Sequence, residues 1–120
     1  MPDARSCLFA AALALCPASA LAHAFLQDAV PAVGGTVRAP PPEAAITFTE
    51  ALEPSFSRIE VTDAAGARVD RGAAHGAPGD ARRLAVALAA LPPGTYTVAW
   101  HATSTDTHKT EGRYTFTVTP

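Results

Sequence analysis

The sequence predicts an all-β protein, an immunoglobulin-like Greek-key β-sandwich of about seven strands. Three observations lead to this fold class. Apolar and polar residues alternate with a period of two from residue 43 onward, turn-forming residues separate the alternating segments, and no segment combines a sustained helical period with caps. With 120 residues, the chain has the length of one domain with one hydrophobic core.

Five segments carry the alternation, and each places one face on a core and the other in water. They are "AITFTE" (45–50), "SRIEVTD" (57–63), "RLAVALA" (83–89), "TYTVAWHA" (95–102) and "RYTFTVT" (113–119). The side chains expected to face the core are Ile46, Phe48, Ile59, Val61, Leu84, Val86, Leu88, Tyr96, Val98, Trp100, Tyr114, Phe116 and Val118. The N-terminal "HAFLQDAV" (23–30) and a short "ARVDR" (67–71) bring the expected number of strands to seven.

Turns are predicted between these strands by clusters that contain Gly or Pro. The clusters here are "VGG" (33–35), "APPPE" (39–43), "AAG" (64–66), "HGAPGD" (75–80) and "LPPG" (91–94). The alanine-rich "LAVALAAL" has helical propensity, but the "PPG" that follows it and the alternation before it favour a strand. Tyr96 begins a strand just after a Pro-Gly turn, which is typical of the tyrosine corner of such sandwiches.

The first 22 residues have the pattern of a secretory signal peptide, so we expect residues 23–120 to form the mature domain. A short polar start with Arg5 precedes an apolar run too short to span a bilayer, and "PASALA" ends the segment in small residues. The pattern allows cleavage after Ala20 or after Ala22, and only the second cut makes His23 the new N-terminus. Cys16 raises the alternative of a lipoprotein, but Leu15 stands where such a signal usually has a small residue.

Removal of this leader would take away both cysteines and the only methionine, so the mature chain would have no disulfide and no soft sulfur ligand. The leader holds one basic and one acidic residue, so the net charge stays at −2. With no basic block, nucleic acid is excluded as an expected partner. No second apolar run of membrane-spanning length follows, and the sequence therefore predicts a soluble product outside the cytoplasm.

Candidate metal ligands lie in "STDTHKTEG" (104–112), before the last predicted strand. In an extended conformation Asp106 and His108 would point to the same side, with Cα atoms about 6.5 to 7 Å apart. Asp-x-His alone is a weak signal, because such triplets are common in loops. If cleavage follows Ala22, His23 adds its α-amine and its ring Nδ1, which can chelate one cation. Three nitrogens and one carboxylate oxygen suit tetragonal Cu(II) better than Cu(I).

The mature sequence resembles the CopC family of periplasmic copper-binding proteins. The most specific features are the histidine directly after the leader, the strand end "ITFTE", and the run W-x-x-x-S-x-D-T-H followed by G-x-Y-x-F. The resemblance implies a Greek-key β-sandwich that binds one Cu(II) per chain through the amine and ring of His23, Asp106 and His108. It also implies cleavage after Ala22. Because no methionine follows Met1, the methionine-rich Cu(I) site of one branch of the family is expected to be absent.

Other interpretations of these residues remain open. Glu50 matches a family position near the metal, which implies a weak axial or outer contact, but it is equally well explained as a solvated carboxylate at a strand end. His23 can instead be an exposed residue at a frayed terminus, and Asp106 and His108 can belong to a turn held by aspartate hydrogen bonds. His101 and His75 are expected to be exposed histidines rather than ligands.

The function that the resemblance implies is Cu(II) binding in the periplasm for copper resistance or homeostasis, without catalysis. The expected partners are the copper ion and an inner-membrane copper importer or another periplasmic copper protein, with the chain itself a monomer. One alternative is an oxidative enzyme of the polysaccharide monooxygenase type, which also uses an N-terminal histidine to bind copper. Another is a metal-free adhesion or chaperone module built on the same sandwich.

Overall fold

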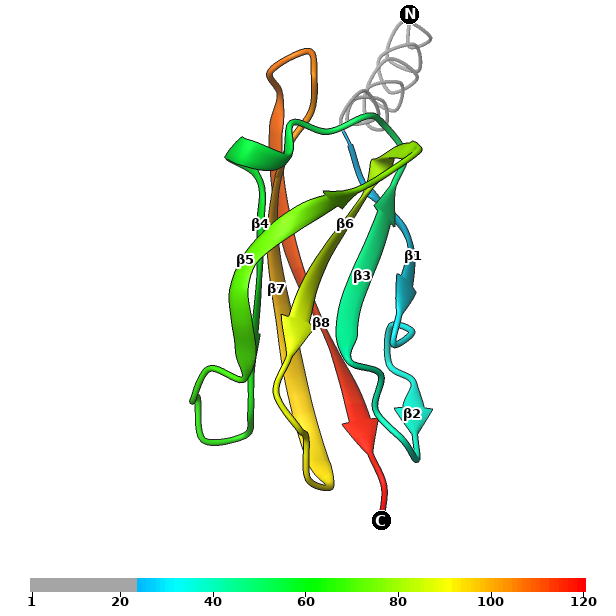
Figure 1. Cartoon of the computed structure of the whole chain (residues 1–120), viewed down its shortest axis with the longest axis vertical. Helices are drawn as coiled ribbons and strands as arrows, with labels where there is room; N and C mark the ends of the chain where they lie inside the picture. Colours follow the sequence, from blue (N-terminus) through cyan, green and yellow to red (C-terminus); the bar gives the residue numbers. More distant parts are fainter. Residues whose placement is uncertain (1–23) are drawn as a thin grey trace, which may run out of the picture.

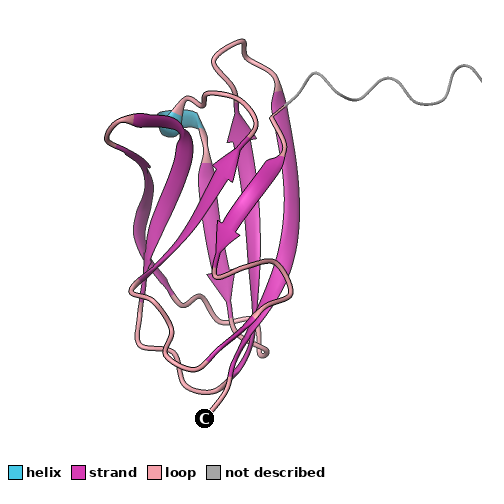
Figure 2. Ribbon diagram, turned by 90° about the vertical axis from the view of Figure 1, so that its right-hand side faces the viewer, coloured by secondary structure: helices cyan, strands magenta, loops and turns pink. Residues whose placement is uncertain are grey.

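The computed structural model describes residues 24–120, which form two four-stranded β-sheets packed face to face (Figures 1 and 2). One sheet has the strand order β1-β3-β6-β5 and the other β2-β8-β7-β4. The strands are β1 (Leu26–Val30), β2 (Thr36–Val37), β3 (Glu43–Phe48), β4 (Arg58–Thr62), β5 (Asp70–Ala77), β6 (Asp80–Leu88), β7 (Gly94–Thr103) and β8 (Lys109–Val118). A 3-10 turn, η2 (Pro54–Phe56), precedes β4.

This architecture confirms the predicted all-β sandwich. The chain stays in one sheet only between β5 and β6 and between β7 and β8, and it changes sheet at every other connection, as expected for a sandwich with Greek-key connections. All strand pairs are antiparallel except β2 with β8, which is parallel. Among residues 24–120, no helix is long and apolar enough to cross a membrane.

The core lies between the two sheets and contains every side chain that the alternation assigned to it. The ring centroids of Phe48 and Trp100 lie 5.1 Å apart in an edge-to-face arrangement, and those of Tyr96 and Phe116 lie 5.5 Å apart and are stacked. Such aromatic pairs stabilise a core beyond their buried area, by about 0.5–1.5 kcal/mol each. The Phe48–Trp100 pair thus joins the two sheets, and the Tyr96–Phe116 pair joins β7 and β8 of one sheet, in a domain whose described residues contain no cysteine.

Gly112 is placed opposite Trp100 in the pairing of β7 with β8. A Cβ atom at Gly112 would lie 2.7 Å from Cζ2 of the indole and 2.9 Å from its Cε2, which is closer than real side chains come. The glycine therefore gives the indole of Trp100 room to lie against β8. This contact is a physical reason for the glycine in the G-x-Y-x-F run.

The tyrosine corner is also confirmed, because the hydroxyl of Tyr96 donates a 2.5 Å hydrogen bond to the carbonyl of Pro92. This bond links the start of β7 to the turn that enters it. Burial, together with the negative charge of Asp63, raises the pKa of Tyr96 above its ordinary value.

Two expectations about the strands were wrong in detail. The structure has eight strands rather than seven, because the short β2 pairs with the end of β8 through only two residues, too few to produce a visible alternation. β5 runs through Ala77, so His75 lies in a strand and not in a glycine-rich loop, although its side chain is exposed as expected. The register of β5 against β6 shifts between Arg71 and His75, and this irregularity hides the strand in the sequence.

Candidate functional site

The candidate ligands Asp106 and His108 lie in the loop of residues 104–108 that joins β7 to β8. Figure 1 shows this loop, in orange, at the end of the sandwich where the described chain begins. The ten residue pairs of β7 and β8 run up to Thr103 and Lys109, so a long, regular hairpin supports the loop. Ser104 is buried and pairs with Leu52 in an isolated bridge, which ties the base of the loop to the segment after β3.

The loop is a tight turn, as in the alternative interpretation of Asp106 and His108, and not the extended segment for which their Cα spacing was considered. The amide of Thr107 donates to the carbonyl of Ser104 at 2.8 Å, and the amide of Ser104 donates to the carbonyl of His108 at 2.9 Å. Thr107 has a φ of 73°, in the left-handed region that β-branched residues rarely adopt. The surrounding hydrogen bonds hold Thr107 in this conformation, and the turn brings together the residues on either side of it.

The side chains of Asp106 and His108 contact one another, with Oδ1 of Asp106 3.2 Å from Nδ1 of His108. Both side chains are about half exposed, at 52% and 50%. The hydroxyl of Ser104 donates to the same Asp106 oxygen, and the amide of His108 lies 3.4 Å from it. The bond from Ser104, aided by those from His108, holds the pKa of the Asp106 carboxyl below its usual range despite partial desolvation. The turn therefore offers an ionised carboxylate beside an imidazole.

The third predicted ligand, His23, lies outside the described residues. Its neighbour Ala24 is the first residue described, and only 1% of its surface is exposed. The hydroxyl of Thr110 donates to the carbonyl of Ala24 at 2.7 Å. The next residue, Phe25, exchanges two hydrogen bonds with Thr49, each of 2.9 Å. The start of the described chain is thus attached both to β8 and to the segment after β3.

Glu50 lies in that segment after β3, and its neighbour Ala51 accepts a 3.0 Å hydrogen bond from the amide of Thr105. Its backbone therefore runs beside the loop that carries Asp106 and His108. Within residues 24–120, however, no three His, Cys, Asp or Glu side chains lie close enough together to hold a metal ion. The structure brings Asp106 and His108 together but does not bring the Glu50 side chain to them.

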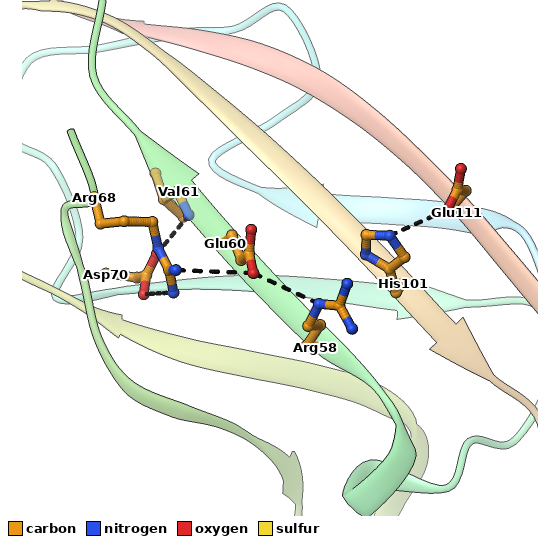
Figure 3. Close-up of polar contacts among 7 residues, drawn as sticks. All are labelled: Arg58, Glu60, Val61, Arg68, Asp70, His101 and Glu111. Atoms are coloured by element: carbon orange, nitrogen blue, oxygen red, sulfur yellow. Dashed lines mark hydrogen bonds and ion pairs between the residues drawn. The ribbon is translucent and has the colours of Figure 1, made fainter. Parts of the chain in front are cut away.

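His101 belongs to a different part of the surface, on the outer face of β7 (Figure 3). Its Nε2 atom lies 3.1 Å from Oε1 of Glu111, the residue opposite it on β8. Its Nδ1 atom is buried and has no hydrogen-bond partner among the described residues. The same face carries charged side chains of β4 and of the segment before β5, whose contacts Figure 3 draws. His101 is therefore paired with Glu111 on this face, separate from the neighbouring network of Arg58, Glu60, Arg68 and Asp70.

The most buried member of this network is Asp70, whose side chain is only 3% exposed. Arg68 binds its carboxylate through two nitrogens at 2.7 and 2.9 Å, and the amide of Val61 donates to it at 2.6 Å. Desolvation acts to raise the pKa of Asp70, but these hydrogen bonds outweigh it and the pKa is lowered. We assign this carboxylate a structural role, because it connects β4 to the start of β5.

Sequence reasoning missed two groups of residues that arrange this end of the molecule. Ser104 orients Asp106, and the S-x-D spacing, at which a hydroxyl can bond a nearby carboxylate, was a signal that could have identified it. Thr49 and Thr110 bond to the N-terminal segment although they are 24 and 86 positions away from their partners in the chain. No local pattern reveals such contacts.

Comparison with known proteins identifies the class to which this sandwich belongs. The family model described as "CopC domain" matches residues 26–119. Protein YobA of Escherichia coli K12 is 40% identical over 119 residues, covering 96% of each chain. The crystal structure of CopC from Methylosinus trichosporium OB3b superposes with a TM-score of 0.76 at 36% identity, covering 82% of this chain and 95% of that one.

A second solved structure is PcoC, described as a methionine-rich copper resistance protein from Escherichia coli. It superposes with a TM-score of 0.69 at 38% identity, covering 81% of this chain and 99% of that one. The chain belongs to the CopC family. In contrast to a methionine-rich relative, it has one methionine, at position 1.

Proposed function

We propose that this protein binds one Cu(II) ion in the periplasm and serves copper resistance or homeostasis by sequestering the ion or transferring it. The proposed ligands are the amine and ring of His23, the carboxylate of Asp106 and the imidazole of His108. Membership of the CopC family, which includes copper resistance proteins, supports this function. The proposal includes removal of residues 1–22, which would create the amine at His23.

The observation that carries the proposal is the 3.2 Å separation of Oδ1 of Asp106 and Nδ1 of His108. Two donors that bind one metal ion at about 2.0–2.1 Å and at right angles lie about 2.9 Å apart. The two atoms therefore need little movement to occupy neighbouring corners of a Cu(II) plane. The lowered pKa of Asp106 keeps the carboxylate ionised, as a metal ligand must be.

We further propose that the protein binds copper without catalysing a reaction. Four strong donors fill the plane of a Cu(II) centre, whereas catalytic metal sites keep a position open for substrate. A surface depression of about 390 Å³ lies on the same hairpin, and Phe56, His101, Lys109 and Glu111 are among its lining residues. Asp106 and His108 lie outside this depression. Peroxide-dependent oxidation of a polysaccharide by the copper-loaded protein would contradict this part of the proposal.

The direct test is a Cu(II) competition titration of the exported protein and three variants. His108→Ala and Asp106→Asn remove one proposed ligand each, and His75→Ala removes an exposed histidine of β5 as a matched control. We expect one Cu(II) per chain for the wild type and for His75→Ala, and much weaker binding for the two ligand variants. Equal binding by all four proteins would refute the proposed site.

Transfer of the ion requires a partner, for which we propose an inner-membrane copper importer or another periplasmic copper protein. The half-exposed ligands at a loop tip support this proposal, since an acceptor could reach them without unfolding of the sandwich. A monomeric donor is expected.

A further inference from the structure

The described chain begins with a segment that is held by both sheets. From one sheet, the hydroxyl of Thr110 on β8 donates a 2.7 Å hydrogen bond to the carbonyl of Ala24. Beyond the end of β3 in the other sheet, Thr49 accepts a 2.9 Å bond from the amide of Phe25 and donates one of 2.9 Å to its carbonyl. The segment preceding β1 thus spans the two sheets at one end of the sandwich.

The attachment through Thr110 joins this segment to the hairpin that carries the candidate ligands. Thr110 is two residues beyond His108 and lies opposite Ala102 in the pairing of β7 with β8. Ala24 and Ala102 are both almost completely buried, at 1% exposed each. The hydroxyl of Thr110 therefore bonds to the carbonyl of a buried residue, through a hydrogen bond that is itself partly buried.

We propose that Thr110 is a positioning residue for Cu(II) binding, which acts by holding the N-terminal segment against the hairpin of Asp106 and His108. This inference rests on the proposed function. His23 is joined to Ala24, and the Cα atoms of successive residues lie about 3.8 Å apart. Anchoring Ala24 therefore limits the volume that the amine and ring of His23 can explore. The entropy of ordering that residue is then lost on folding rather than on metal binding.

The expected effect of losing the anchor is a weaker site with unchanged ligands. Thr110→Val keeps the shape of the side chain but removes the hydroxyl. In Thr110→Val, the backbone of one more residue would have to become ordered when Cu(II) binds. The free energy of ordering one residue corresponds to about a tenfold change in a binding constant, so we expect Cu(II) affinity to fall about tenfold. Thr110→Ser keeps the hydroxyl and should restore most of the affinity. Thr115→Val is the matched control, because Thr115 is an exposed threonine of the same strand.

A purely structural role for Thr110 is distinguished by combining the substitution with loss of the ligand that it is proposed to position. In a His23→Ala background, a positioning residue for His23 has nothing left to position, so Thr110→Val should cause no further loss of affinity. A structural residue would weaken binding by the same factor in both backgrounds. Double-mutant cycles of this kind isolate the coupling of two residues from their separate effects.

The experiment is therefore a Cu(II) competition titration with electron paramagnetic resonance spectra of the exported wild type, Thr110→Val, Thr110→Ser, Thr115→Val, His23→Ala and the double variant. Support requires a weaker, spectroscopically altered site in Thr110→Val alone, rescue by serine, and no additional loss in the His23→Ala background. Wild-type affinity and spectrum in Thr110→Val would overturn the positioning role while the copper function stands. Failure of the wild type itself to bind Cu(II) would overturn both proposals.

Discussion

Loss of the tyrosine hydroxyl should destabilise the fold at Tyr96 but not at Tyr114, the two tyrosines of the core. Tyr96 donates its hydroxyl to the carbonyl of Pro92 at 2.5 Å, whereas the Tyr114 hydroxyl is buried without a hydrogen-bond partner among the described residues. Burial raises the pKa of Tyr114 to about 12. Substitution of each tyrosine by phenylalanine therefore removes a satisfied hydroxyl in one case and an unsatisfied one in the other.

The magnitude follows from the free energy of such hydrogen bonds. Loss of an intramolecular hydrogen bond costs about 1 kcal/mol, and here the exposed Pro92 can regain a water molecule, so we expect Tyr96→Phe to lower the free energy of unfolding by about 1 kcal/mol. For a domain of this size the melting temperature should fall by about 4–8 °C. Tyr114→Phe removes a desolvated polar group, so stability should stay the same or rise.

Urea unfolding followed by the fluorescence of Trp100, the only tryptophan, measures both variants against the wild type. The ultraviolet absorbance of the folded protein gives an independent check, because burial raises the pKa of Tyr114 to about 12 and its ionisation should therefore be half complete only at that pH while the fold persists. Equal destabilisation by the two substitutions, or a larger loss in Tyr114→Phe, would refute the assignment of the two hydroxyls.

Three further predictions concern packing and pH. Gly112→Ala places a Cβ atom 2.7 Å from the Trp100 indole, so the free energy of unfolding measured in urea should fall by about 1–3 kcal/mol. An unchanged midpoint of urea unfolding would contradict the contact. Asp70 has a lowered pKa, so its contribution to stability is present above its ordinary pKa, near 4, and is lost as the pH falls through the lower, folded value. Asp70→Asn should therefore lower the free energy of unfolding by about 1–3 kcal/mol at pH 7, and by less as the pH falls below about 4. Melting curves of the two proteins from pH 2 to 7 measure this difference, and a difference that stays constant over that range would contradict the prediction. Copper affinity should fall steeply below a pH of about 6, because protons compete with the metal for amine and imidazole nitrogens, whose reference pKa values in model peptides are about 8 and 6.5. A flat affinity between pH 5 and 8 would argue against amine ligation.

The sandwich could be predicted from the sequence because its strands alternate regularly and each inward side chain is apolar. The strand that was not predicted, β2, and the one that was predicted only in part, β5, are those that break this rule. β2 is too short to show a period, and the bulged β5 places Gly72 and Gly76 where a regular strand would have larger side chains.

The candidate site could be predicted only in part. The pairing of Asp106 with His108 was anticipated, and a turn at these residues was one of the alternatives. The form of the turn could not be predicted, because the left-handed conformation of Thr107 depends on hydrogen bonds from the surrounding loop. Thr49 and Thr110 are ordinary threonines of alternating strands in the sequence, and their hydrogen bonds to the N-terminal segment exist only once the two sheets have packed.

Mass spectrometry of the exported protein, recorded under native conditions with and without Cu(II), tests the central proposal most directly. We expect a chain that begins at His23 and gains one copper ion. A chain that begins at Leu21, after cleavage at Ala20, or one that begins at His23 and gains no copper, would contradict the account of how this site is assembled.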